Sequence, residues 1–91
     1  MKYDMSSHGK SLTNEAICNQ IYTDLEPYFE EEKIELDFSN VSILTTTCIK
    51  GLFLKIANKM PSEVFFKKFV FENVDEDLRI IISHGLEDIY N

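Results

Sequence analysis

The alternation of strand-like and helix-like hydrophobic periods is the feature that most constrains this fold. In residues 34–38, Ile34, Leu36 and Phe38 point one way and two acidic residues the other, as in a half-buried strand. Residues 11–29 and 47–59 carry apolar residues at helical spacing. Strand patterns at 1–5 and 67–74 and a last helix at 75–91 complete the order strand, helix, strand, helix, strand, helix. This order predicts an α/β fold, a small layer of a few mostly parallel strands with helices.

Polar residues before the apolar periods predict where the helices begin. Ser11 or Thr13 is expected to cap the first helix, and Asp75 is expected to cap the last. Pro61 stops the second helix or starts a short turn, and Gly85 either interrupts the last helix or allows a close contact.

Length and cysteine content predict one domain over residues 1–91 in a reducing compartment. Hydrophobic residues make up 44% of the 91-residue chain, which is enough for a core. No apolar run approaches the roughly 18 residues that span a bilayer, and the first residues lack the apolar region of a signal peptide. Cys18 and Cys48 form no CxxC motif and are predicted to be thiols. We therefore expect a cytoplasmic location.

The charge and the missing motifs argue against several classes of function. A net charge of −7 disfavours binding to nucleic acid or to an anionic membrane and favours a partner with a basic face. "HGKS" at 8–11 lacks the first glycine of a phosphate-binding loop, because that position is Asp4. His8 and His84 have no metal-ligand spacing, and no nucleophile elbow is present. We expect a protein that is not an enzyme and has no cofactor.

Three consecutive threonines, Thr45 to Thr47, lie where the central strand region gives way to the second helix. A threonine hydroxyl can cap a helix start, and the helix dipole stabilises negative charge there. A phosphate on one of these hydroxyls would be tolerated locally and would change the charge of the surface. The alternative is a cap and a β-branched strand end without any modification.

The stretch "IELDFSNVSILTTTCIKGLF" resembles the central motif of STAS domains, the fold of anti-sigma factor antagonists. Thr45 falls where that family has Asp, Thr46 falls on its phosphorylatable Ser or Thr, and Thr47 falls on the next hydroxyl residue. Cys48, Ile49 and Lys50 replace Gly-Leu-Gly. "GKSLTNEAI" and "LDFSNV" are similar to the pattern of a group of short, uncharacterised bacterial STAS-like proteins.

The resemblance implies a regulatory protein-interaction module, switched by phosphorylation in the manner of anti-sigma factor antagonists. Thr46 would be the phosphoacceptor, flanked by an interaction surface of Thr45, Thr47, Cys48 and Lys50. The implied partner is a protein, such as a histidine-kinase-like ATPase. The missing Asp and glycines favour the alternative of a constitutive binding or scaffold module that has this fold and no switch. A small enzyme or ligand carrier using Cys48 or the strand ends is a third hypothesis.

Overall fold

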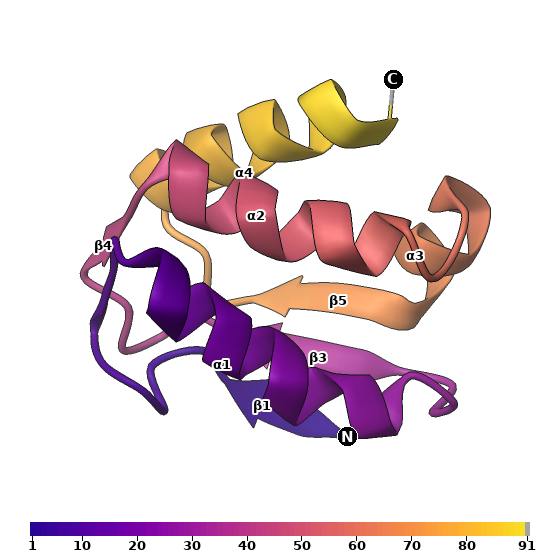
Figure 1. The fold of residues 1–91 in the computed structure, drawn as a ribbon. Coiled ribbons are helices and arrows are strands. Elements are labelled where there is room, and N and C mark those ends of the chain that lie inside the picture. Colours follow the sequence, from indigo (N-terminus) through magenta and orange to yellow (C-terminus); the bar gives the residue numbers. More distant parts are fainter. Residues whose placement is uncertain (91) are drawn as a thin grey trace.

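The computed structural model describes residues 1–90, and it contains a three-stranded parallel sheet (Figure 1). The strands are β1 (Lys2–Asp4), β3 (Ile34–Asp37) and β5 (Phe69–Glu72), in the order β1-β3-β5. A separate parallel pair joins β2 (Ser11–Leu12) to β4 (Ile43–Leu44). The predicted α/β fold with a small parallel sheet is confirmed, and β3 is its central strand.

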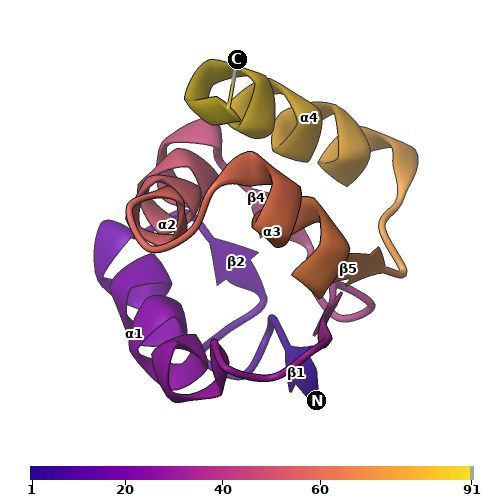
Figure 2. The same ribbon diagram turned by 90° about the vertical axis from the view of Figure 1, so that its right-hand side faces the viewer.

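The helices gather on one face of this sheet, as Figures 1 and 2 show together. They are α1 (Glu15–Leu25), α2 (Thr46–Ala57), α3 (Ser62–Lys68) and α4 (Glu76–Tyr90), with a short 3-10 turn, η1 (Glu26–Tyr28), after α1. Ile34, Leu36 and Phe38 are at most 1% exposed beneath the helices. Among the described residues, no helix is long and apolar enough to span a membrane.

The opposite face of the sheet carries mainly charged side chains. Leu36 lies beside Tyr3 and Phe71 in the register, and these three positions share the covered face. The positions between them include Glu35 and Asp37, which remain partly exposed. A parallel sheet is usually covered on both faces, so this small domain is unusual in leaving one face open.

Two of the predicted local features differ from the structure. Asn14 caps α1, since its Oδ1 accepts the Ala16 amide at 2.7 Å; the predicted cap at Ser11 or Thr13 is wrong. Ser11 is instead held in β2 by its pairing with Ile43, a contact between distant segments. The segment after Pro61 forms the helix α3 rather than a simple turn.

The other two predictions about helix ends fit the structure. Asp75 Oδ1 accepts the Leu78 amide at 2.9 Å, which confirms Asp75 as the cap of α4. Gly85 does not interrupt α4 but permits a close contact. A Cβ at Gly85 would lie 3.0 Å from Ile49 Cγ2 of α2.

Cys18 and Cys48 form a disulfide, so the prediction that both are thiols is wrong. The residues are 30 positions apart, but α1 and α2 pack side by side and bring their Cα atoms to 5.9 Å. Free thiols therefore no longer support a cytoplasmic location, which stays a prediction.

Candidate functional site

The start of α2 is held in place by Thr45. The Thr45 hydroxyl accepts the Cys48 amide at 3.3 Å, which is the side-chain cap that the threonine run predicted. The Thr45 amide donates to the Leu12 carbonyl at 3.1 Å, which ties the cap to β2. The hydroxyl and the amide of Thr45 are therefore both engaged in hydrogen bonds that hold the helix start, and the side chain is only partly exposed.

Thr46 and Thr47 occupy the first turn of α2 with exposed side chains. Neither residue supplies the cap, so a change to either hydroxyl leaves the helix start intact. No acidic residue lies in this first turn. The unpaired amides and the dipole of a 12-residue helix give this end a positive partial charge, which stabilises a nearby anion.

Lys50 lies one turn after Thr46 and connects the site to α4. Its Nζ lies 2.5 Å from Asp88 Oδ2, and both side chains are partly exposed. The hydrogen bond from Lys50, together with its charge, lowers the pKa of Asp88. Lys50 could therefore also reach an anion placed on Thr46, since residues four apart on a helix share a face.

Cys48 does not belong to the exposed surface that the resemblance implied. Its side chain is 2% exposed and bonded to Cys18, beneath the first turn of α2. The same burial removes the hypothesis of an enzyme or carrier that uses a Cys48 thiolate, because a bridged sulfur is not a nucleophilic thiolate. Of the expected residues, the structure brings Thr45, Thr46, Thr47 and Lys50 to one surface.

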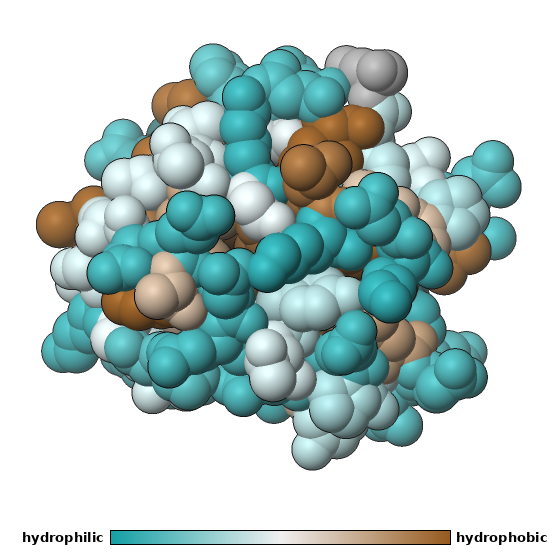
Figure 3. Space-filling model, in the orientation of Figure 1, coloured by the Kyte–Doolittle hydropathy of each residue, from teal (hydrophilic) through white to brown (hydrophobic). Residues whose placement is uncertain are grey.

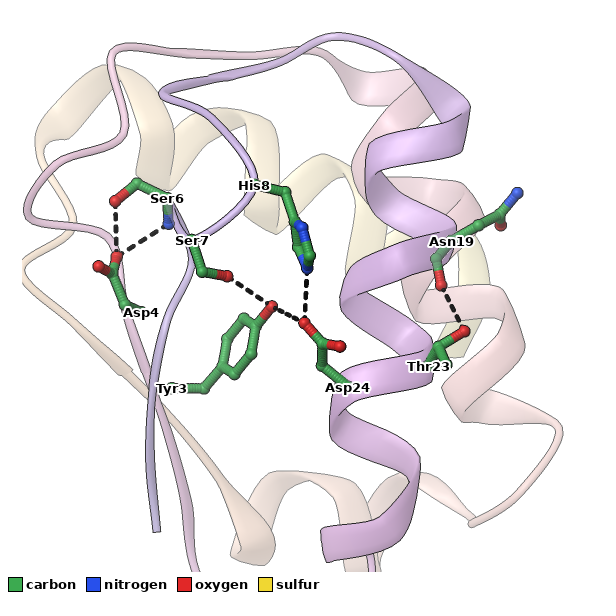
Figure 4. Close-up of polar contacts among 8 residues, drawn as sticks. All are labelled: Tyr3, Asp4, Ser6, Ser7, His8, Asn19, Thr23 and Asp24. Carbon is green, nitrogen blue, oxygen red and sulfur yellow. Dashed lines mark hydrogen bonds and ion pairs between the residues drawn. The ribbon is translucent and has the colours of Figure 1, made fainter.

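A second polar cluster was missed by the sequence reasoning (Figure 4). Asp24 Oδ2 on α1 receives two contacts, from His8 Nε2 at 2.6 Å and from the Tyr3 hydroxyl at 2.8 Å. The Ser7 hydroxyl donates to the Tyr3 oxygen at 2.8 Å. The cluster joins β1, the loop after it and α1, and no motif of adjacent residues signals it.

The hydrogen bonds of this cluster shift two pKa values. Contact with His8, and then with Tyr3, lowers the pKa of Asp24. Burial raises the pKa of Tyr3 to about 12, and its hydrogen bond to Asp24 acts in the same direction. Ser7 contacts Tyr3 rather than His8, so the groups do not form a Ser-His-Asp relay. Among residues 1–90, no group of His, Cys, Asp and Glu is placed to hold a metal ion.

Comparison with known proteins identifies a family for this chain. Residues 19–79, from α1 to the first turn of α4, match the family described as a STAS-like domain of unknown function (DUF4325). The match covers well over half of the chain and includes the whole of α2. No curated protein and no solved structure matches the chain. The chain therefore belongs to the family of STAS-like domains of unknown function.

Proposed function

We propose that this STAS-like domain is a regulatory protein-interaction module whose contact surface contains the start of α2, and that phosphorylation of Thr46 switches its binding. The proposal rests on the different roles of two neighbouring threonines. Thr45 supplies the cap through its bond to the Cys48 amide, whereas Thr46 is exposed at the first position of α2 and has no structural task.

The physical argument is that a phosphate on Thr46 changes the surface but not the fold. The phosphate gains about 0.3 to 1 kcal/mol from the helix dipole. It also adds a charge of about −1.5 to −2 to a contact surface that has no acidic residue in the first turn of α2. A partner that binds the neutral surface must then desolvate or pair this charge.

The proposed partner is a protein with a basic face, because the chain carries a net charge of −7. The resemblance to anti-sigma factor antagonists favours a histidine-kinase-like ATPase as that partner. The proposed role is binding, without catalysis or a cofactor of its own, in the cytoplasm.

The test is an affinity pull-down from native cells, followed by affinity measurements on the captured partner. Mass spectrometry of the peptide containing Thr46 tests for the phosphate. Thr46→Glu should weaken binding with a nearly unchanged melting temperature, and Thr46→Ala should bind as the wild type does. Thr47→Glu is the matched control for an added charge one residue away. If wild type, Thr46→Glu and Thr46→Ala bind equally, the switch is excluded.

A constitutive binding module is the second candidate, and the disulfide favours it. Cys48 stands where the related pattern has glycine, and its bond to Cys18 fixes the first turn of α2 against α1. A rigid surface of this kind can bind without a regulated change. Equal partner affinities in the three proteins would support this candidate.

A further inference from the structure

Residues of α3, β5 and α4, with the loop between β5 and α4, line a hollow on the protein surface. Its volume is about 420 Å³. Its lining is mainly apolar and includes Phe66, Phe69, Phe71, Val74, Ile82 and Leu86. The face drawn in Figure 3, by contrast, is mainly hydrophilic with small separate hydrophobic areas.

One wall of this hollow is a strand edge without a neighbour. Within residues 1–90, β5 pairs with β3 alone. The Phe38 amide donates to the Glu72 carbonyl at 3.0 Å, so the backbone groups of Glu72 and, two residues earlier, Val70 face β3. The backbone N–H and C=O of Phe71 therefore point away from the sheet, toward an open edge.

Exposed apolar side chains accompany this edge. Phe66, in the helix that leads into β5, is 54% exposed, and Val70 in the strand itself is 37% exposed. An open edge beside apolar surface is the arrangement that accepts another strand.

The charge along this edge changes sign from one end of β5 to the other. Lys67 and Lys68 precede the strand, and Lys67 is exposed with no ion pair among the described residues. Glu72 ends the strand, and the acidic start of α4 follows it. Oε1 of Glu72 is buried and has no hydrogen-bond partner. The edge is thus complementary to a second β5 that runs in the opposite direction.

We propose that β5 pairs antiparallel with β5 of a second copy of this chain, which joins the two sheets into one of six strands. A two-fold axis at Val70 places Phe69 of one copy opposite Phe71 of the other, and Lys68 of each copy opposite Glu72 of the other. The Phe71 amide of each copy then donates to the Phe69 carbonyl of the second copy. Asn73, with φ of 57°, bends the chain away after β5 and ends the pairing.

This arrangement closes on itself as a dimer, because each copy offers one β5 edge and both are used. The shared strand is only four residues long, so the dimer is weak and its population depends on concentration. The start of α2 is not part of this interface. The dimer is therefore independent of the proposed function of Thr46.

The first test is sedimentation equilibrium of the full chain over a concentration series from micromolar to millimolar. The wild type should shift from monomer to dimer. Val70→Lys should remain monomeric, because a lysine on an edge strand opposes pairing. The matched control is Leu54→Lys, at a 54% exposed position of α2, and it should dimerise as the wild type does. A wild type that stays monomeric throughout, or a Val70→Lys variant that dimerises normally, would overturn the proposal.

Charge exchange tests the antiparallel direction. Lys68→Glu and Glu72→Lys should each weaken the dimer by up to about tenfold, since Lys68 of each copy lies opposite Glu72 of the other and like charges then meet across two symmetric pairs. The double variant restores opposite charges and should recover the wild-type association. A dimer whose strength is the same in all four proteins would contradict this direction. Binding of β5 to a strand of some other protein, without self-association, would also overturn the proposal.

Discussion

β1 and β5 are both edge strands of the sheet, but only at β1 do local turns and a charged side chain protect the edge. On the β1 side, the outward carbonyl of Asp4 accepts the Ser7 amide at 3.1 Å, and the Asp4 carboxylate accepts the Ser6 amide at 2.9 Å. Lys2, the other residue with outward backbone groups, places a charge on the edge. On the β5 side, the outward groups of Phe71 meet no such turn.

The helices above the two edges, α1 and α4, are held to the rest of the fold by different kinds of contact. α1 is bonded to α2 through the disulfide and to β1 through the Tyr3–Asp24 contact. α4 lies against α2 mainly through apolar packing around Gly85, with the Lys50–Asp88 ion pair at the surface. A small sheet can thus protect one edge by local turns and cross-links and keep the other available for pairing.

The largest expected effect comes from the strand that both sides share. Leu36→Ala should lower the free energy of unfolding by about 2 to 5 kcal/mol, because it leaves a cavity at a fully buried position. Leu54→Ala, at an exposed position, is the control and should change it by about 0.5 kcal/mol or less. Urea denaturation measures both. An unchanged midpoint for Leu36→Ala would mean that β3 is not central to the fold.

The cross-link on the β1 side should give the next effect. The disulfide closes a loop between residues 30 positions apart, and breaking it should cost about 3 to 4 kcal/mol. Unfolding of the wild type is measured with and without a reductant. The control is the double variant Cys18→Ala, Cys48→Ala, whose stability should not respond to the reductant. If the reductant also leaves the stability of the wild type unchanged, the folded protein contains no disulfide.

The packing of α4 on the β5 side should be sensitive to added volume. Gly85→Leu should destabilise the fold by about 1 to 3 kcal/mol, because even its Cβ meets Ile49 at 3.0 Å. Gly51→Leu is the matched change in α2, where no atom lies within 4 Å of the added Cβ. It should stabilise by up to about 1 kcal/mol through helix propensity. Thermal unfolding measures the stability of both variants. Equal shifts of the melting temperature would mean that α4 does not pack closely on α2.

The hydrogen bond that fastens β1 to α1 should give the smallest effect. Tyr3→Phe removes the hydroxyl bound to Asp24 and should cost about 0.5 to 1.5 kcal/mol. Tyr28→Phe, at a 45% exposed position, should cost almost nothing.

The same hydroxyl gives a dependence on pH. Since burial raises the pKa of Tyr3 to about 12 in the folded protein, its contribution is complete below about pH 10 and is lost as the pH rises toward 12. Wild type and Tyr3→Phe should therefore converge in stability over that range. A constant difference between them would show that Tyr3 titrates normally.

The order of the three sheet strands and of α1, α2 and α4 was predictable, and so were the caps of α2 and α4, whereas the Asn14 cap, the β2–β4 pair and α3 were not. Strand and helix periods depend on residues two to four positions apart, so Leu36 and its neighbours could be placed correctly from the sequence. The caps at Asp75 and within the threonine run follow from side chains that bond amides three residues on.

Features that join distant segments were not predictable in this way. The pairing of Ser11 with Ile43, the disulfide and the His8–Asp24 contact each depend on how helices and strands pack. The hollow beside β5 depends on where α4 settles after the chain turns at Asn73. At the candidate site, the exposure of Thr46 agrees with the sequence interpretation, but the burial of Cys48 required the structure.

Amide hydrogen exchange of Val70 and Phe71, followed by NMR at low and high protein concentration, tests the open edge most directly. The two amides are neighbours in one strand but face opposite sides, Val70 toward β3 and Phe71 outward. We expect Val70 to be protected at both concentrations, and Phe71 to exchange fast when dilute and slowly when concentrated. Fast exchange of Phe71 at every concentration, or equal protection of both amides in dilute solution, would contradict an open edge that a second copy fills.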